Sequence, residues 1–118
     1  MIVGTGIDIV ELDHMDAVCQ KQPRICNKIL TPKELEVYET LGEKRKLEFL
    51  SGRYAAKEAF SKAMGTGIGK TVTIQNVSIL NNEKGQPMVI ESPFSGNIFV
   101  SISHSKNMAV AQVILESD

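Results

Sequence analysis

The stretch "EFLSGRYAAKEAFSKAM" (48–64), which runs directly into "GTGIGKT" (65–71), decides the fold of this chain. Apolar residues recur in the first stretch at helical spacing, which predicts one long helix from about residue 43 to residue 64. Gly65 follows at the place where a glycine commonly ends a helix in the left-handed conformation. The next segment, "TVTIQNVSIL" (71–80), is rich in β-branched residues and predicts a strand.

The segment 65–71 also shares half of the phosphate-binding P-loop pattern, G-x-x-x-x-G-K-[ST]. Gly69 and Lys70 fit that pattern, but Met64 stands where its first glycine is needed. A P-loop joins a strand to the N-terminus of a helix, whereas this segment joins a helix to a strand. The sequence therefore favours a helix-to-strand connection over an NTPase. A glycine-rich turn that a ligand approaches closely stays open as an interpretation.

The segments before the long helix predict a strand and two shorter helices. Residues 1–10 are apolar and β-branched and predict a strand. Residues 12–22 predict a short helix with Asp13 as its N-cap, interrupted at Pro23. A further helix is predicted over 31–42. Its ends are marked by an N-cap threonine, a proline at the first helical position, a capping-box glutamate and a terminating glycine: Thr31, Pro32, Glu34 and Gly42.

The remainder of the chain predicts strands joined by polar turns. A strand around 88–92 pairs back on 71–80 as a hairpin, and two more strands follow at 98–105 and 108–116. Helices therefore cluster in the first half and strands in the second, which predicts an α+β fold with an antiparallel sheet. The length is typical of one domain, so we expect a single domain over residues 1–118.

The composition limits the class of protein. The net charge of −1 argues against a broad nucleic-acid footprint. No signal peptide and no long apolar run are present, which argues against a membrane protein. Cys19 and Cys26 lack the partners of a zinc site, and we interpret them as reduced thiols. We expect a cytoplasmic protein.

Three charged residues of the long helix have ambiguous positions. Arg53 and Lys57 fall beside its apolar face, where an unpaired buried cation is costly. Each therefore extends its charge to solvent, forms a pair, or faces a polar ligand or a partner chain. Glu58 falls on the opposite side, where it can simply form a solvated pair with Lys62 one turn later.

Asp8 is the only charge in the strand 1–10. Its side chain points to the same face as Gly6 and Val10, and the simplest interpretation puts it on a wet face. A carboxylate beside glycines also suits Mg²⁺, which takes one or two protein carboxylates and completes its shell with water and phosphate oxygens. Glu58 is the natural second ligand, although spacing alone does not bring the two together.

The segment "SISHS" (101–105) ends a predicted strand. The simplest interpretation is an exposed histidine at a strand end. The alternative is a contact of the imidazole and the neighbouring hydroxyls with a polyanion. A Ser-His-Asp hydrolase is a weaker option, because no G-x-S-x-G elbow is present and Ser103 and His104 point to opposite faces.

Three stretches then occur together over nearly the whole chain: "GTGIDIVEL" (4–12), "GRYAAKEAFSKAMGTGIG" (52–69) and "SISHS" (101–105). In this order and spacing they resemble the bacterial holo-[acyl-carrier-protein] synthases, the small class of 4′-phosphopantetheinyl transferases. The resemblance implies that family's fold and a Mg²⁺-dependent reaction. The 4′-phosphopantetheine arm of coenzyme A passes to a serine of apo-acyl carrier protein, for fatty acid biosynthesis, and leaves adenosine 3′,5′-bisphosphate. It also implies a homotrimer with active sites at the clefts between protomers.

The resemblance also implies roles for particular residues. Asp8 and Glu58 would bind Mg²⁺ and take part in catalysis, and Glu58 or a metal-bound water near Asp8 would accept the proton of the acceptor serine. Lys57 and Lys62 are the expected phosphate contacts, and Lys62 is also an expected catalytic residue. The remaining expected contacts with coenzyme A are Gly65, Thr66, His104 and Ser105.

An acidic carrier protein needs a cationic docking surface. In relatives the first helix carries arginines, whereas this chain offers Lys21 and Arg24, with His14 where an arginine is expected. Docking would then depend more strongly on pH, because a neutral histidine lacks the charge. The alternative to the transferase is a non-catalytic trimer that binds coenzyme A or a nucleotide. Such a binder would be free to lose Asp8 or Glu58.

Overall fold

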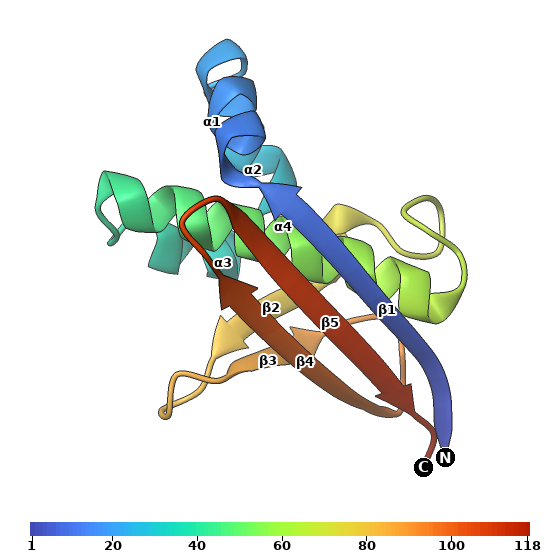
Figure 1. Cartoon of the computed structure of the whole chain (residues 1–118). Helices are drawn as coiled ribbons and strands as arrows, with labels where there is room; N and C mark the ends of the chain where they lie inside the picture. Colours follow the sequence, from blue (N-terminus) through green and yellow to red (C-terminus); the bar gives the residue numbers. More distant parts are fainter.

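The computed structural model describes all 118 residues and has the predicted α+β architecture. The long helix α4 (Glu43–Met64) crosses one face of an antiparallel sheet with the order β1 (Ile2–Glu11), β5 (Met108–Glu116), β4 (Asn97–His104), as Figure 1 shows. Strands β2 (Ser78–Asn81) and β3 (Pro87–Glu91) form a separate antiparallel hairpin. The smaller helices are α1 (Leu12–Lys21), α2 (Ile25–Ile29), α3 (Pro32–Tyr38) and the 3₁₀ turn η1 (Ile74–Asn76).

Helix α4 lies very close to strand β1 because both surfaces carry small side chains. A Cβ atom at Gly4 would collide with the carbonyl of Ala63, and one at Gly6 would collide with the carbonyl of Ala59. The core around this contact is largely aliphatic, and Phe60 is its only fully buried aromatic residue. No helix of the structure combines the length and the apolar character needed to span a bilayer.

The predicted helix boundaries are partly confirmed. Gly65 ends α4 with φ +81°, as its position predicted, and the Thr31–Glu34 capping box begins α3. Helix α3 ends at Tyr38, however, and Gly42 is the N-cap residue of α4 instead of the end of α3. The N-cap of α1 is Glu11 and not Asp13, because strand β1 runs into that helix without a loop.

The prediction of a strand over 71–80 was wrong for most of that segment, because only its last residues belong to a strand, β2. Thr73 and Asn76 form a reciprocal pair of side-chain to backbone bonds, with the Thr73 amide donating to Asn76 Oδ1 at 3.0 Å and the Asn76 amide donating to Thr73 Oγ1 at 3.1 Å. Such local bonds compete with a strand ladder and here fold the chain into η1. The short helix α2 was not predicted.

The two ambiguous cations of α4 are both paired inside the chain. Lys57 is fully buried, and its ammonium donates to Glu34 Oε1 at 2.6 Å and to the carbonyls of Ile29 and Ile74 at 2.7 and 3.1 Å. Arg53 is almost as deeply buried. Burial lowers the pKa of Lys57, although Glu34 opposes that shift, and lowers the pKa of Arg53 to about 10. Neither side chain extends to solvent.

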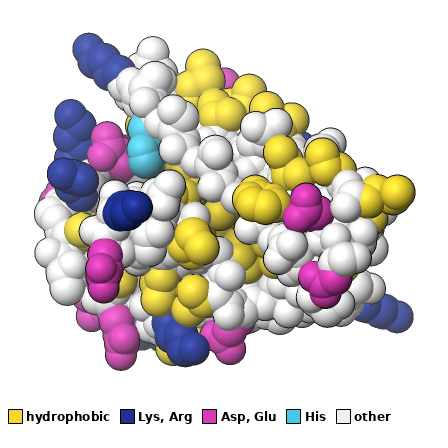
Figure 2. All heavy atoms as spheres, turned by 90° about the horizontal axis from the view of Figure 1, so that it is seen from below, with side chains coloured by type: hydrophobic (Ala, Val, Ile, Leu, Met, Phe, Trp, Pro, Cys, Tyr) yellow, Lys and Arg dark blue, Asp and Glu magenta, His cyan; other side chains and the backbone are white.

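The face of the sheet opposite α4 is apolar and uncovered. Ile7 and Ile9 on β1 are each 57% exposed, and Phe99 on β4 is 54% exposed. Phe99 lies opposite Ile114 of β5 on that face. In the view of Figure 2, hydrophobic side chains gather along the upper margin of the molecule, whereas many charged groups lie toward the left and lower margins.

Candidate functional site

A cavity of about 360 Å³ lies where β1, α1 and α4 meet. It brings together three residues that the sequence analysis singled out from separate stretches, Asp8, His14 and Glu58. The residues that complete its wall are Ile9, Val10, Glu11, Met15 and Tyr54. The two expected metal ligands therefore line one cavity.

Asp8 has a cationic partner at the edge of this cavity. Lys62 Nζ donates to Asp8 Oδ1 and to the carbonyl of Ile7, each at 3.0 Å. The Lys62 side chain is 52% exposed and that of Asp8 is 18% exposed. Lys62 thus pairs with Asp8 across the helix–sheet junction, and the simpler expectation that it pairs with Glu58 was wrong.

Glu58 is half-buried and takes part in no ion pair of the structure. Tyr54 precedes it by one helical turn and lines the same cavity. Burial raises the pKa of the Tyr54 phenol, and the negative charges of Glu58 and Asp8 raise it further. This wall of the cavity therefore presents the Glu58 carboxylate, which has no ion-pair partner, beside the neutral hydroxyl of Tyr54.

The donor set of the cavity suits a hard cation. No group of three or more His, Cys, Asp and Glu side chains in the structure could hold a metal alone. Zinc sites usually need three or four such ligands. Mg²⁺ is instead bound by one or two carboxylates together with waters and substrate phosphates. Asp8 and Glu58 fit that ion in the presence of a phosphorylated ligand.

His104 lies at the opposite edge of the sheet from Asp8. It is the last residue of β4, whereas Asp8 belongs to β1, and β5 separates the two strands. A Cβ atom at Gly52 of α4 would lie 3.1 Å from His104 Nε2, so the glycine leaves room for the imidazole. One chain therefore does not bring His104 to the cavity of Asp8.

A second cavity, of about 200 Å³, surrounds His104. Two arginines of α4, Arg45 and Arg53, line it beside Asn81. Arg53 Nε donates to the Ile79 carbonyl at 3.0 Å, and its Nη2 donates to Asn81 Oδ1 at 3.1 Å. Arg45 was not predicted from the sequence, although it lies only about two helical turns before Arg53.

The other expected coenzyme A contacts have differing surroundings. Thr66 is exposed, and its hydroxyl donates to the Gly67 carbonyl at 2.9 Å. Around Gly65 a Cβ atom would meet nothing within 4 Å, so this turn is open to a ligand. Ser105 shapes the β4–β5 turn, where its Oγ accepts from the amides of Asn107 and Met108 at 3.2 and 3.1 Å.

Lys57 is not a phosphate contact in this structure. It is fully buried, and all three hydrogens of its ammonium are donated to oxygens of the same chain. A phosphate would have to displace the partner carboxylate of Glu34 from the core. The expectation for Lys57 is therefore corrected, whereas Lys62 remains accessible at the cavity of Asp8.

The three expected docking residues are all exposed. His14 and Lys21 lie on α1, and Arg24 lies directly before α2. Arg24 and Lys28 line a shallow hollow of about 420 Å³ beside the turn that joins the two helices. Cationic groups therefore follow one another along α1 and α2, beginning at the cavity of Asp8 and Glu58.

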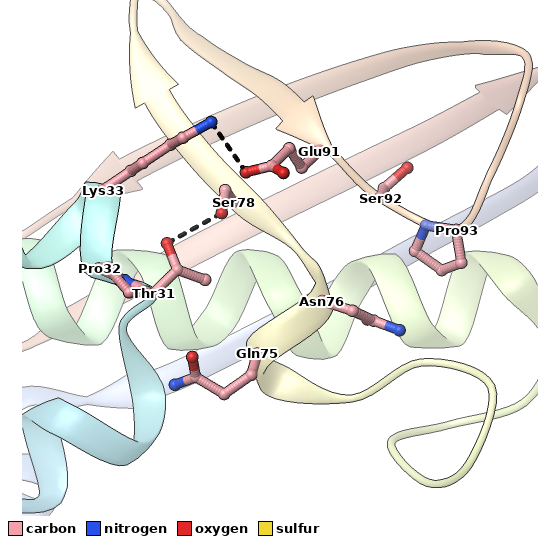
Figure 3. Close-up of a pocket in the computed structure, with 9 residues that line it drawn as sticks. All are labelled: Thr31, Pro32, Lys33, Gln75, Asn76, Ser78, Glu91, Ser92 and Pro93. Atoms are coloured by element: carbon pink, nitrogen blue, oxygen red, sulfur yellow. Dashed lines mark hydrogen bonds and ion pairs between the residues drawn. The ribbon is translucent and has the colours of Figure 1, made fainter.

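A roomier cavity, of about 520 Å³, lies between the start of α3, η1 and the end of β3, and none of the expected site residues line it (Figure 3). Its two charged groups, Lys33 and Glu91, pair with each other at 3.1 Å. The hydroxyl of Ser78 donates to Thr31 Oγ1 at 2.9 Å. With its only cation paired, this cavity suits a phosphate less well than that of His104, which has Arg45 and Arg53 in its wall.

Comparisons with known proteins agree on one family. The model of the 4′-phosphopantetheinyl transferase superfamily matches residues 4–114. Among curated relatives, a holo-[acyl-carrier-protein] synthase of Enterococcus faecalis is 51% identical over 118 residues, with 100% of both chains covered. One of Levilactobacillus brevis is 52% identical over 116 residues, which are 98% of this chain and 95% of the relative.

Solved structures give the same result. A holo-(acyl-carrier-protein) synthase from Bacillus anthracis, in complex with CoA (3′,5′-ADP), superimposes with a TM-score of 0.93 at 47% identity. The match covers 100% of this chain and 99% of that one. The enzyme from Neisseria meningitidis matches with a TM-score of 0.91 at 33% identity, over 99% of this chain and 100% of that chain.

Proposed function

The chain belongs to the 4′-phosphopantetheinyl transferase superfamily, and we propose that it transfers the 4′-phosphopantetheine group of coenzyme A to a serine of apo-acyl carrier protein. The products are holo-acyl carrier protein, for fatty acid biosynthesis, and adenosine 3′,5′-bisphosphate. The observation that carries the proposal is the meeting of Asp8 and Glu58 in one cavity, with the exposed Lys62 at its edge. The non-catalytic binder would not need this pair.

The reaction forms a bond between the serine oxygen and the β-phosphorus of coenzyme A and breaks the bond from that phosphorus to the bridging oxygen of the pyrophosphate. Asp8 and Glu58 would hold Mg²⁺, which supplies Lewis-acid stabilisation of the phosphate oxygens when bound. Lys62 places a positive charge at the same cavity and is free to reach a phosphate with its exposed end. Glu58, which has no cationic partner, would accept the serine proton, with a water near Asp8 as the alternative acceptor.

The cavity around His104 is the proposed site for the nucleotide end of coenzyme A. Arg45 and His104 provide donors for phosphate at its wall, and an arginine binds phosphate with two parallel hydrogen bonds. Arg53 already donates to Ile79 and Asn81. It therefore contributes mainly its positive charge to the cavity. The open turn at Gly65 and Thr66 would approach coenzyme A through its backbone.

A homotrimer follows from the same proposal and has support in the structure. The sheet face with Ile7, Ile9 and Phe99 is uncovered, and contiguous apolar surface of this kind is typical of protein interfaces. Because Asp8 and His104 lie at opposite edges of the sheet, a complete site would combine the Asp8 edge of one protomer with the His104 edge of the next. Head-to-tail contacts of this type close into rings.

The carrier protein would dock on α1 and α2 through His14, Lys21 and Arg24, which are all exposed, and His14 also lines the Asp8 cavity. The reaction would take place in the cytoplasm, whose reducing conditions suit the two free cysteines, Cys19 and Cys26.

The test is a mass spectrum of apo-acyl carrier protein after incubation with the chain, coenzyme A and Mg²⁺. We expect the carrier mass to increase by one phosphopantetheine, and we expect EDTA to prevent the increase. A folded chain that binds coenzyme A but leaves the carrier unchanged would contradict the transferase and favour the non-catalytic binder.

A further inference from the structure

Helix α2 is too short to be stable by itself. It has five residues, and helices of fewer than about 12 residues are marginal without tertiary contacts. Its own backbone satisfies the Cys26 carbonyl, which accepts from the Leu30 amide at 2.8 Å. The last carbonyls of a helix have no partner within it. Those that follow Cys26 therefore need donors from elsewhere in the chain.

Gln75 of η1 supplies most of these donors. Its side-chain amide nitrogen donates to three carbonyls at the end of α2, those of Asn27 at 3.2 Å, Lys28 at 2.9 Å and Leu30 at 3.0 Å. The two hydrogens of this nitrogen are thus shared among three acceptors. Figure 3 shows the Gln75 side chain extending from η1 toward the segment that leads into Thr31.

The remaining carbonyl of this turn, that of Ile29, accepts from Lys57 at 2.7 Å. The four carbonyls of residues 27–30 therefore all have donors that lie between 28 and 48 positions away in the sequence. The two anchors differ in their surroundings, because Lys57 is fully buried and Gln75 is exposed. Gln75 is the anchor that a substitution can remove without leaving a charge in the core.

The anchored helix carries part of the cationic surface. Arg24 directly precedes α2, Lys28 lies within it, and both line the hollow of about 420 Å³ at the α1–α2 turn. Neither forms an ion pair, and no acidic side chain lines the hollow. An acidic partner would find two unpaired cations there. A surface that is already ordered binds more tightly than one that must become ordered during binding.

We propose that Gln75 is a positioning residue that holds α2, and with it Arg24 and Lys28, in the arrangement that receives the acidic carrier protein. The inference rests on the carrier docking of the proposed function. Gln75 lies outside the cavities of Asp8 and His104. Its loss should therefore weaken the binding of carrier protein and leave the binding of coenzyme A unchanged.

The first test compares Gln75→Met with Gln86→Met. Both substitutions replace an exposed glutamine by an apolar side chain of similar length, and the Gln86 amide bonds only within the β2–β3 turn. Isothermal titration calorimetry measures the affinity of each protein for apo-acyl carrier protein. We expect Gln75→Met to weaken this affinity by about three- to tenfold, the range of one hydrogen bond. We expect Gln86→Met to bind the carrier as the wild type does.

A second readout separates positioning from direct contact, because an exposed side chain could also touch the carrier itself. Amide hydrogen exchange is measured in the free protein, before any carrier is added. The amides of Asn27 and Leu30, which donate to the carbonyls of Arg24 and Cys26, should exchange about three- to tenfold faster in Gln75→Met. The amides of α4 should exchange as in the wild type.

The steady-state kinetics should show the same separation. In Gln75→Met the KM for carrier protein should rise, while the KM for coenzyme A and the kcat at saturating carrier stay unchanged. Weaker carrier binding with unchanged exchange in α2 would make Gln75 a contact residue and overturn the inference. Faster exchange with unchanged carrier affinity would make its role purely structural and overturn it equally.

Failure of the proposed function is distinguishable from failure of this inference. A wild-type chain that neither binds nor modifies the carrier contradicts the transferase, and the docking role of Gln75 falls with it. A wild-type chain that modifies the carrier, together with a Gln75→Met variant of equal carrier affinity, overturns the inference alone.

Discussion

Two lysines of helix α4, five positions apart, form ion pairs with opposite characters. Lys57 meets Glu34 at 2.6 Å with both side chains fully buried. Lys62 meets Asp8 at 3.0 Å, and its side chain is 52% exposed. The first pair ties α4 to α3, while the second spans the edge of the cavity that carries the proposed chemistry.

The two pairs differ in how much hydrogen-bonding capacity their side chains leave unused. Every hydrogen of the Lys57 ammonium is used, and both oxygens of Glu34 are bonded, one to the Ile79 amide at 2.8 Å. Lys62 keeps a side chain in water, and the pair it forms with Asp8 is open to competition by a phosphate or a metal ion. A saturated pair stabilises a fold, whereas an unsaturated pair can bind a ligand.

The largest effect is expected from breaking the buried pair. Glu34→Ala leaves the Lys57 charge buried without its carboxylate, and we expect a loss of about 3–5 kcal/mol in the free energy of unfolding. Urea denaturation followed by circular dichroism measures the loss. The matched control is the double variant Glu34→Ala with Lys57→Met, which should recover part of the stability. A loss in Glu34→Ala below that of an ordinary surface substitution would contradict the role of this pair.

Substitutions at the two carboxylates of the Asp8 cavity should lower the activity and leave the stability unchanged. Asp8→Ala and Glu58→Ala should each lower the transfer rate by more than about a hundredfold, because each removes a proposed metal ligand. The melting temperature should stay unchanged, and the proposed trimer, measured by size-exclusion chromatography with light scattering, should persist. Activity near that of the wild type in either variant would remove the metal-site assignment, and loss of the trimer would make the residue structural.

Mixing two inactive variants tests whether the Asp8 edge works with the His104 edge of a neighbour. Asp8→Ala and His104→Ala are each expected to be inactive, and they are denatured together in equal amounts and refolded. If the sites are shared around a ring, about one quarter of them receive both intact residues, and activity returns to that level. A mixture as inactive as its components would place both residues in the same protomer's site.

A smaller effect is expected at His14, which lines the cavity of the exposed pair. His14→Arg should bind carrier protein more tightly than wild type, because arginine adds a permanent positive charge to the surface that meets the acidic carrier. Surface plasmon resonance measures both affinities, and equal affinity of the two proteins would count against docking through His14.

The smallest effect is expected for Lys62→Met on stability. Exposed ion pairs contribute about 0–1 kcal/mol, and salt of about 1 M screens them. The free energy of unfolding should therefore change little and should not differ from that of wild type at high salt. A loss as large as that of Glu34→Ala would show that the two pairs are alike after all.

Local signals explain which parts of the fold could be predicted. The capping box of Thr31 and Glu34 and the terminal Gly65 act over a few residues, so their outcome is visible in the sequence. Segment 71–77 was misassigned because its β-branched residues favour a strand, while the Thr73–Asn76 bonds favour a turn. Helix α2, with five residues, is too short to show a helical period.

The candidate site depends on contacts between residues far apart in the sequence, which local sequence patterns do not reveal. Helical spacing puts Lys57 beside the apolar face and Lys62 on the opposite side. Their partners, Glu34 and Asp8, lie more than 20 positions away in each case and could not be predicted from that spacing. The link between Asp8 and Glu58 came from the family resemblance and not from spacing. The cluster of Arg45 and His104 arises where α4 passes the end of β4, which requires the folded chain.

The glycines of β1 have a consequence for the dimensions of the cavity. No side chain stands between Gly6 and the carbonyl of Ala59, so the backbones of strand and helix are in contact there. Asp8 lies two positions from this contact along β1, and Glu58 lies one position from it along α4. The absence of a side chain at Gly6 thus lets the strand and the helix that carry the two carboxylates lie close together. An alanine at position 6 would act as a spacer, and cavity size is one of the properties that separate Mg²⁺ from the larger Ca²⁺. In the proposed metal site, the absent methyl group at position 6 would therefore influence ion preference together with the oxygens of Asp8 and Glu58.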